Sequence, residues 1–129
     1  MIEYTEEMLK AEGYELQNAE ITSVDLSMAD HCCLTLRMAL DGGGWGCVYG
    51  GYSLGNGFVG AKTFKGSAAG LEYIMRIMDV VGVDEFNELK GKYVRVATKG
   101  WGSECKIIGN ILKDKWFDPV SFFLDSEES

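Results

Sequence analysis

The chain has 129 residues, of which 47% are hydrophobic and 12% aromatic. This length is typical of a single domain with one core, and this composition excludes a disordered chain. The formal net charge is −8, no stretch approaches the roughly 20 apolar residues that cross a bilayer, and the N-terminus is acidic where a signal peptide would be basic. The sequence therefore predicts a soluble, cytoplasmic protein.

The first third of the chain predicts a helix followed by two strands. A short helix is expected over residues 5–12, because Thr5 can cap its start and Gly13 can end it. A strand with a bulge is expected over residues 21–28, where the alternation of apolar residues slips once. The clearest alternation covers residues 33–40 and predicts a half-buried strand.

Glycine dominates the next segment. Residues 41–44 predict a hairpin, because glycine adopts the positive φ that tight turns need, and a third strand is expected over about residues 45–49. Nine glycines lie between Gly42 and Gly60. That density is expected to weaken regular structure and to let the backbone approach another group closely.

A long amphipathic helix is predicted from residue 67 to Gly82, because apolar residues recur there at helical spacing. The residues expected to form its apolar face are Leu71, Ile74, Met75, Met78 and Val81. A short turn capped by Asp84 is expected next, and then a hairpin of strands over residues 93–96 and 105–112. The Asp118-Pro119 pair predicts a final helical turn over residues 120–124.

Connections of hairpin length between neighbouring strands imply antiparallel pairing. The sequence therefore predicts a single α+β domain over residues 1–129. An antiparallel sheet of about five strands, in two hairpin units, would pack against the long helix, with short helices at the two ends of the chain. Residues 125–129 are expected to form a frayed acidic tail.

The cysteines and the single histidine offer little chemistry. An adjacent pair in strand-like apolar surroundings favours reduced, buried thiols over a disulfide framework. Neighbours on a strand point to opposite faces, so the residues around His31 make a poor zinc site. The spacing from Gly55 to Gly60 matches a dinucleotide-binding loop, but no helix follows it at once. No catalytic residue, metal or cofactor is expected. The residues considered for a metal site are His31, Cys32, Cys33 and Cys47, and Cys105 is the remaining cysteine.

Negative charge gathers at the two ends of the chain. Residues 1–30 carry eight acidic residues and one lysine, whereas residues 31–117 carry eleven basic and eight acidic residues. Such a distribution can be only solubilising, but it also suits a protein that occupies a basic, nucleic-acid-binding groove of a partner. The acidic residues assigned to partner binding are Glu3, Glu6, Glu7, Glu12 and Glu15.

Two sets of aromatic residues are further candidates, and ordinary core packing stays open for both. Rigid rings among glycines suit recognition of a partner protein, or of a small ligand such as a cyclic nucleotide. These rings are Trp45, Tyr49, Tyr52 and Phe58. Basic residues interleaved with aromatic residues suit single-stranded nucleic acid. This set is Tyr93, Arg95, Trp101 and Lys106.

Four segments resemble small uncharacterised accessory proteins encoded by phages and prophages of Gram-positive bacteria. They are GGYSLG at 50–55, IMRIMDVVGV at 74–83, LKGKYVRV at 89–96 and IGNILKDKWF at 108–117. The resemblance implies a protein that works in the cytoplasm of a bacterial host cell. Acidic phage proteins of this size are often inhibitors of host defence, among them anti-CRISPR proteins, which occupy a nucleic-acid channel or sequester a signal nucleotide.

The sequence therefore predicts a non-enzymatic protein that acts by stoichiometric binding, as an inhibitor of a bacterial defence system. Its partner would be a host or phage protein of a nucleic-acid-handling complex, not a membrane, and a homodimer is left open. The alternatives are a sponge for a small ligand or cyclic nucleotide and a single-stranded nucleic-acid-binding module.

Overall fold

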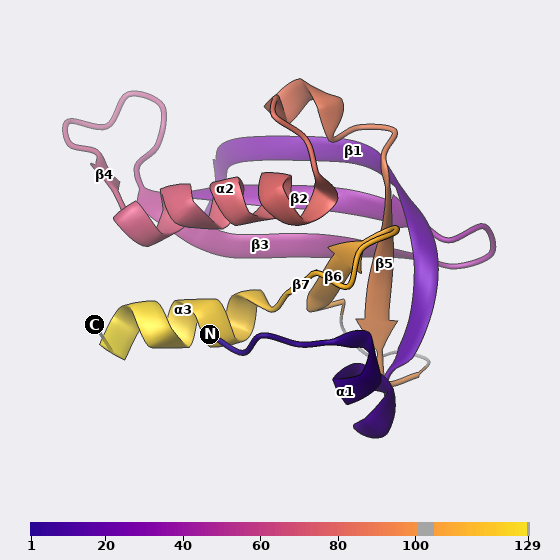
Figure 1. Ribbon diagram of the computed structural model, residues 1–129. Helices are drawn as coiled ribbons and strands as arrows, with labels where there is room; N and C mark the ends of the chain where they lie inside the picture. The colour runs from indigo at the N-terminus through magenta and orange to yellow at the C-terminus, as the bar shows by residue number, and fades with distance from the viewer. Residues whose placement is uncertain (101–104, 129) are drawn as a thin grey trace.

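The computed structural model describes residues 1–100 and 105–128, which form one α+β domain (Figure 1). Seven antiparallel strands of this part of the chain form a single curled sheet, a half-barrel, in the order β4-β3-β2-β1-β5-β6-β7. The strands are β1 (Glu15–Asp30), β2 (Cys33–Asp41), β3 (Gly46–Asn56), β4 (Lys65–Gly66), β5 (Tyr93–Thr98), β6 (Ile107–Asn110) and β7 (Trp116–Phe117). The helices are α1 (Glu6–Ala11), α2 (Ala68–Val81) and α3 (Pro119–Glu128), with a 3-10 helix η1 (Phe86–Glu88).

The predicted first helix is confirmed, because α1 has the expected local signals at both ends. The hydroxyl of Thr5 accepts a hydrogen bond from the backbone N–H of Met8 at 3.2 Å. Gly13 has a φ of 90°, which a residue with a side chain rarely adopts. That conformation lets the N–H of Tyr14 reach the carbonyl of Leu9 at 3.0 Å.

The predicted β1–β2 pair is also confirmed, including its bulge. The register between the two strands shifts between Ile21 and Ser23, where the apolar alternation slips in the sequence. On β2, Leu36, Met38 and Leu40 are all buried. β1 is longer than expected at both ends, since it extends over 16 residues.

The hairpin at residues 41–44 is confirmed, but β3 is much longer than the strand expected after it. Gly50 and Gly51 have φ values of 104° and 91° and form a bulge opposite Leu36 and Arg37. A Cβ at Gly50 would overlap the carbonyl oxygen of Leu36. The glycines therefore keep β3 paired with β2 as far as Asn56, and the prediction that they weaken regular structure there is wrong.

The predicted long helix is confirmed as α2, with one error in its phase. Ser67 caps its start, accepting from the N–H of Gly70 at 2.8 Å, and Gly82 ends it with a φ of 91°. Of the five residues expected on its apolar face, Val81 is buried and Ile74 and Met78 pack against the core. Leu71 and Met75, however, are 68% and 66% exposed, and α2 also buries Tyr73, Ile77 and Val80. Gly70 sets this rotation, because a Cβ there would lie only 2.8 Å from the Cα of Leu54.

Two cores lie on opposite sides of the sheet. The larger one fills the concave side, where α2 lies along the sheet with α3 beside it (Figure 1). A smaller core lies on the convex side, where α1 covers the start of β1 and the end of β5. Its buried members are Leu9, Ala97, Ile107 and Trp116. Burying such side chains contributes about 1.5–3 kcal/mol each for the larger ones, so α1 is anchored to the sheet.

The C-terminal half differs from the prediction in its details. The turn at residues 86–88 forms without a side-chain cap, so Asp84 does not cap it. Asp118 caps α3 as expected, accepting from the N–H of Val120 at 3.1 Å. α3 then continues beyond the expected turn, and the segment expected to fray is helical as far as Glu128. β4 and β7 raise the number of strands from the expected five to seven.

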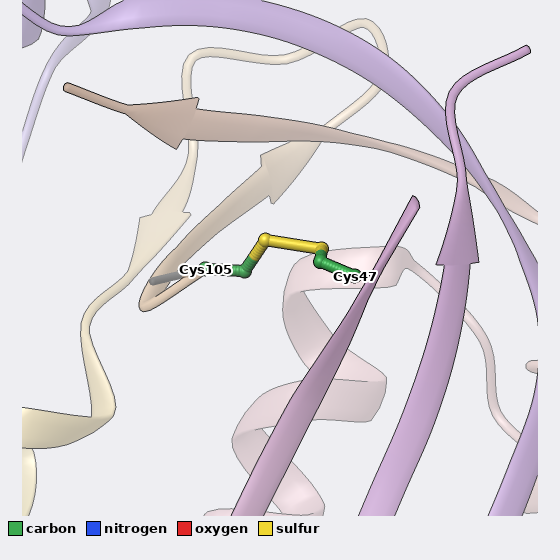
Figure 2. Close-up of a disulfide and its surroundings, with 2 residues drawn as sticks. All are labelled: Cys47 and Cys105. Carbon is green, nitrogen blue, oxygen red and sulfur yellow. A yellow bond between two sulfur atoms is a disulfide. The ribbon is translucent and has the colours of Figure 1, made fainter. Parts of the chain in front are cut away.

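The prediction of reduced cysteines is wrong for Cys47 and Cys105, which form a disulfide with a Cα–Cα distance of 6.7 Å (Figure 2). Cys47 lies on β3 and Cys105 just before β6, and three strands separate β3 from β6 in the sheet. The curl of the sheet brings these two sides together. Cys32 and Cys33 are free as expected, but Cys32 is exposed and Cys33 half-buried, so the prediction that these thiols are buried is wrong. The cytoplasmic location stays a prediction, now without support from reduced thiols.

None of the helices in the described residues is long and apolar enough to span a membrane.

Candidate functional site

The convex side of the sheet, here called the outer face, carries acidic residues along β1 and β2. Successive side chains of a strand point to opposite faces. Because Ile21 and Leu40 belong to the concave core, their neighbours Glu20 and Asp41 lie on the outer face. Asp25 lies farther along the same face, since Val24 packs against the concave core.

Glu20 and Asp41 lie directly opposite each other in the register of β1 and β2. The next residues in this row are Tyr93 on β5 and Gly46 on β3, so the row contains no cation. No ion pair between described residues uses either carboxylate. Like charges in directly opposite positions destabilise a sheet, by an amount on the order of 0.2–1 kcal/mol.

Arg37 is the residue opposite Asp25, but its guanidinium is bonded elsewhere. It donates to a carboxylate oxygen of Asp30 at 2.5 Å and to the hydroxyl of Thr35 at 3.1 Å. The hydrogen bond from Arg37 lowers the pKa of Asp30, so that carboxyl stays ionised. Asp25 itself takes part in no ion pair between described residues.

The acidic residues assigned from the sequence lie on or beside α1. Glu6 is half-buried, and one of its oxygens lies 3.2 Å from the ammonium of Lys10 and 3.6 Å from the guanidinium of Arg95. The other four are exposed and take part in no ion pair between described residues: Glu3, Glu7, Glu12 and Glu15. Glu3, Glu7 and Glu12, on or beside α1, together with Glu20, Asp25 and Asp41 on the outer face are called the acidic strip below. Glu15 is not part of it, because it alternates with Leu16 of the convex core and so lies on the concave side of β1.

Hydrogen bonds hold the N-terminal part of the strip in place. The backbone N–H of Glu6 donates to Asp114 Oδ1 at 2.7 Å, and the indole N–H of Trp116 donates to the same oxygen at 2.7 Å. The N–H of Ile2 donates to Ser121 Oγ at 3.1 Å. Because Leu9 is also fully buried, the strip is presented on an anchored segment.

The four aromatic residues around the glycines do not share one surface. Tyr49 is fully buried. Tyr52 is half-buried, with its ring centroid 5.7 Å from that of Tyr73, and Trp45 is half-buried with its ring over Gly42. Phe58 is the exposed member of the set, at 48%. A ligand platform formed by all four rings therefore has no geometric support.

The basic and aromatic set is also divided. Arg95 donates to the carbonyls of Asn110 and Lys113, at 2.8 Å each, and its guanidinium lies 4.5 Å from the ring centroid of Trp116. Arg95 therefore supports the β6–β7 turn. Tyr93 is 54% exposed on the outer face, Lys106 is exposed, and Trp101 lies outside the described residues.

The residues around His31 form a tight turn. His31 and Cys32 have φ values of 51° and 61° and connect β1 to β2. Within residues 1–100 and 105–128, no group of three or more His, Cys, Asp or Glu side chains is placed to hold a metal ion.

The pair of Glu20 and Asp41 was not singled out from the sequence. The alternation of apolar residues in β1 and β2 can predict which face of the sheet each of these two residues lies on. It cannot predict that they are directly opposite each other, because the strand register depends on where the bulge lies. Comparison with protein-family models, with curated proteins and with solved structures found no match to this chain.

Proposed function

We propose that this protein acts without catalysis, by placing its acidic strip in a basic, nucleic-acid-binding groove of another protein. The observation that carries the proposal is the row of Glu20 and Asp41, in which two acidic residues are directly opposite in the strand register and no residue of the row is basic. Asp41 Oδ1 accepts a hydrogen bond from the backbone N–H of Gly43 at 2.9 Å, so its second oxygen is the one left for a partner. This arrangement costs stability in the free protein. A partner's lysine or arginine placed over the row would relieve the repulsion and gain two charge-assisted contacts.

The shape of the strip suits a groove that normally holds a phosphate backbone. β1 rises about 3.3 Å per residue, so Glu20 and Asp25 are separated by at most roughly 17 Å along the strand, and Glu7 and Glu12 on or beside α1 lie beyond its start. Such a groove presents lysine and arginine side chains at intervals to neutralise phosphates. Fixed carboxylates can replace phosphates there without the cost of ordering a flexible tail.

The partner we favour is a nuclease complex of a bacterial defence system, as the resemblance to phage accessory proteins suggests. Inhibition would then be stoichiometric and of the anti-CRISPR type. Association with a basic groove would be fast at low ionic strength and would slow as salt screens the charges.

Plating of a phage on bacterial strains that each carry one nuclease-based defence system tests this function. The wild-type protein is expected to restore plating on at least one strain. A variant with Glu7→Gln, Glu12→Gln, Glu20→Gln and Asp41→Asn is expected to lose that effect. Lys62→Gln with Lys65→Gln, on exposed residues away from the strip, is the matched control and should keep it. No rescue on any strain, or equal rescue by the charge-neutralised variant, would reject the proposal.

A stability measurement tests the physical basis without a partner. Glu20→Gln with Asp41→Asn should raise the free energy of unfolding by on the order of 0.2–1 kcal/mol at low salt, and the gain should shrink at high salt. Asp84→Asn, a change at an exposed acidic residue outside the row, should leave the free energy of unfolding unaltered. Loss of stability in the double variant would mean that the opposing carboxylates do not repel each other.

A further inference from the structure

The unpaired lysines of this acidic protein are not evenly distributed. All three arginines form ion pairs, and Lys10 and Lys115 are paired as well. Five lysines take part in no ion pair or ring contact between described residues: Lys62, Lys65, Lys90, Lys92 and Lys113. Lys92 and Lys113 line one cavity, and Lys90 lies two residues before Lys92.

This cavity has a volume of about 660 Å³ and lies where the end of α2 meets the start of β5 and the β6–β7 turn. Ligand pockets typically measure about 300–1,000 Å³. Tyr93, which is 54% exposed, and Leu112, which is 88% exposed, supply an aromatic ring and an apolar side chain at its wall. Asn18 adds an exposed carboxamide.

Asn110 fixes the walls of the cavity. Its Nδ2 donates to the carbonyls of Val80 and Val81, at 3.0 and 3.4 Å, at the end of α2. Its Oδ1 accepts from the N–H groups of Leu112 and Lys113, at 2.9 Å each. The helix end, whose free carbonyls would repel an anion, is thereby partly neutralised, and the turn that carries Lys113 is held against it.

We propose that this cavity binds a small phosphate-bearing ligand with a planar ring, of the nucleoside monophosphate class. The ammonium groups of Lys92 and Lys113 would bind the phosphate, Tyr93 would stack on the ring, and Asn18 would hydrogen-bond to a polar edge of the ligand. This site does not depend on the proposed inhibitory function.

The charges around the cavity favour a small ligand over a nucleic-acid strand. Glu20 lies directly beside Tyr93 in the register of β1 and β5, and Asp41 follows it in the same row. A strand leaving the cavity along the outer face would meet these carboxylates, and a chain of net charge −8 repels polyanions generally. A single phosphate can bind to the two lysines without entering this region.

Titration of the ¹⁵N-labelled protein with the four nucleoside 5′-monophosphates, followed by amide chemical shifts, tests the site. At least one of them is expected to give saturable shifts at Asn18, Gly82, Tyr93 and Leu112. Lys92→Gln with Lys113→Gln should raise the dissociation constant at least about tenfold, which corresponds to one lost charge-assisted hydrogen bond. Lys62→Gln with Lys65→Gln removes the same charge elsewhere and should change it little. The unphosphorylated nucleoside should bind more weakly than its monophosphate.

Three results would overturn the proposal. The first is the absence of saturable shifts with all four nucleotides at millimolar concentration. The second is an equal loss of binding in the Lys62 and Lys65 control, which would indicate unspecific attraction. The third is a single-stranded oligonucleotide that binds the same residues at least about tenfold more tightly than any mononucleotide, which would indicate a strand-binding surface. All four lysines are exposed, and the thermal melt of each variant checks that its fold is intact.

Discussion

The disulfide between Cys47 and Cys105 closes the half-barrel, and its removal should show how much of the stability depends on this closure. The two cysteines are 58 residues apart in the sequence. In the chain-entropy description, a crosslink across a loop of this length lowers the entropy of the unfolded chain enough to add about 4 kcal/mol of stability at 25 °C. Single domains are stable by about 5–15 kcal/mol in total, so this is a large share.

Urea unfolding of Cys47→Ser with Cys105→Ser gives the measurement. If the free energy of unfolding falls by about 2 kcal/mol for each molar of urea, the midpoint should fall by about 2 M relative to the oxidised wild type. The wild type in a thiol reductant should fall by a similar amount. The matched control is Cys32→Ser with Cys33→Ser, because these cysteines are free and lie in the β1–β2 turn and at the start of β2.

This prediction is wrong if the variant lacking Cys47 and Cys105 unfolds at the same urea concentration as the oxidised wild type. It would also be refuted if the Cys32 and Cys33 control lost as much stability, since the loss would then not come from loop closure.

Three further predictions concern side chains that hold the fold. Asn110→Ala should lower the free energy of unfolding by about 1–3 kcal/mol, because it removes hydrogen bonds to backbone groups at the end of α2 and in the β6–β7 turn, and an unchanged urea midpoint would contradict this. Gly109→Ala should lower the free energy of unfolding by about 1–3 kcal/mol and shift the tryptophan fluorescence, because the new Cβ would overlap the ring of Trp116. Gly66 faces open space, so Gly66→Ala should lower the free energy of unfolding much less. Burial raises the pKa of the Tyr73 hydroxyl. The contribution of this side chain to the free energy of unfolding is therefore fully present below its pKa in the unfolded chain, about 10, and is lost as the pH rises further. Unfolding from pH 8 to 11 should therefore show stability falling above pH of about 10, less steeply in Tyr73→Phe.

The features that the sequence predicted correctly depend on neighbouring residues. Thr5 and Gly13 set the ends of α1, Ser67 sets the start of α2, and Asp118 starts α3. An N-terminal cap needs only a side chain and a backbone N–H two or three residues away. Such signals are readable without knowing the rest of the fold.

The features that the sequence did not reveal depend on contacts between distant segments. The rotation of α2 follows from the close approach of Gly70 to Leu54 on β3. The disulfide requires the curl that brings β3 near β6. β4 and β7 have two residues each, too few for any periodicity to show.

In the candidate site, too, local features could be predicted from the sequence and features that depend on distant contacts could not. The acidity of the N-terminal segment is plain from composition, and the structure places four of its five assigned residues on an anchored, exposed segment. The opposition of Glu20 and Asp41 required the strand register. Tyr49 was assigned to partner binding because its type suits recognition, yet the same ring suits a core, and here it is fully buried.

The most direct test of the acidic strip is a competition experiment with the nuclease complex identified by plating. A fluorescently labelled DNA is bound to that complex, and its anisotropy is followed as this protein is added. One equivalent of the wild-type protein should release the DNA, whereas the variant neutralised at Glu7, Glu12, Glu20 and Asp41 should leave it bound. DNA that stays bound in the presence of the wild-type protein, or that the neutralised variant releases equally well, would contradict the account.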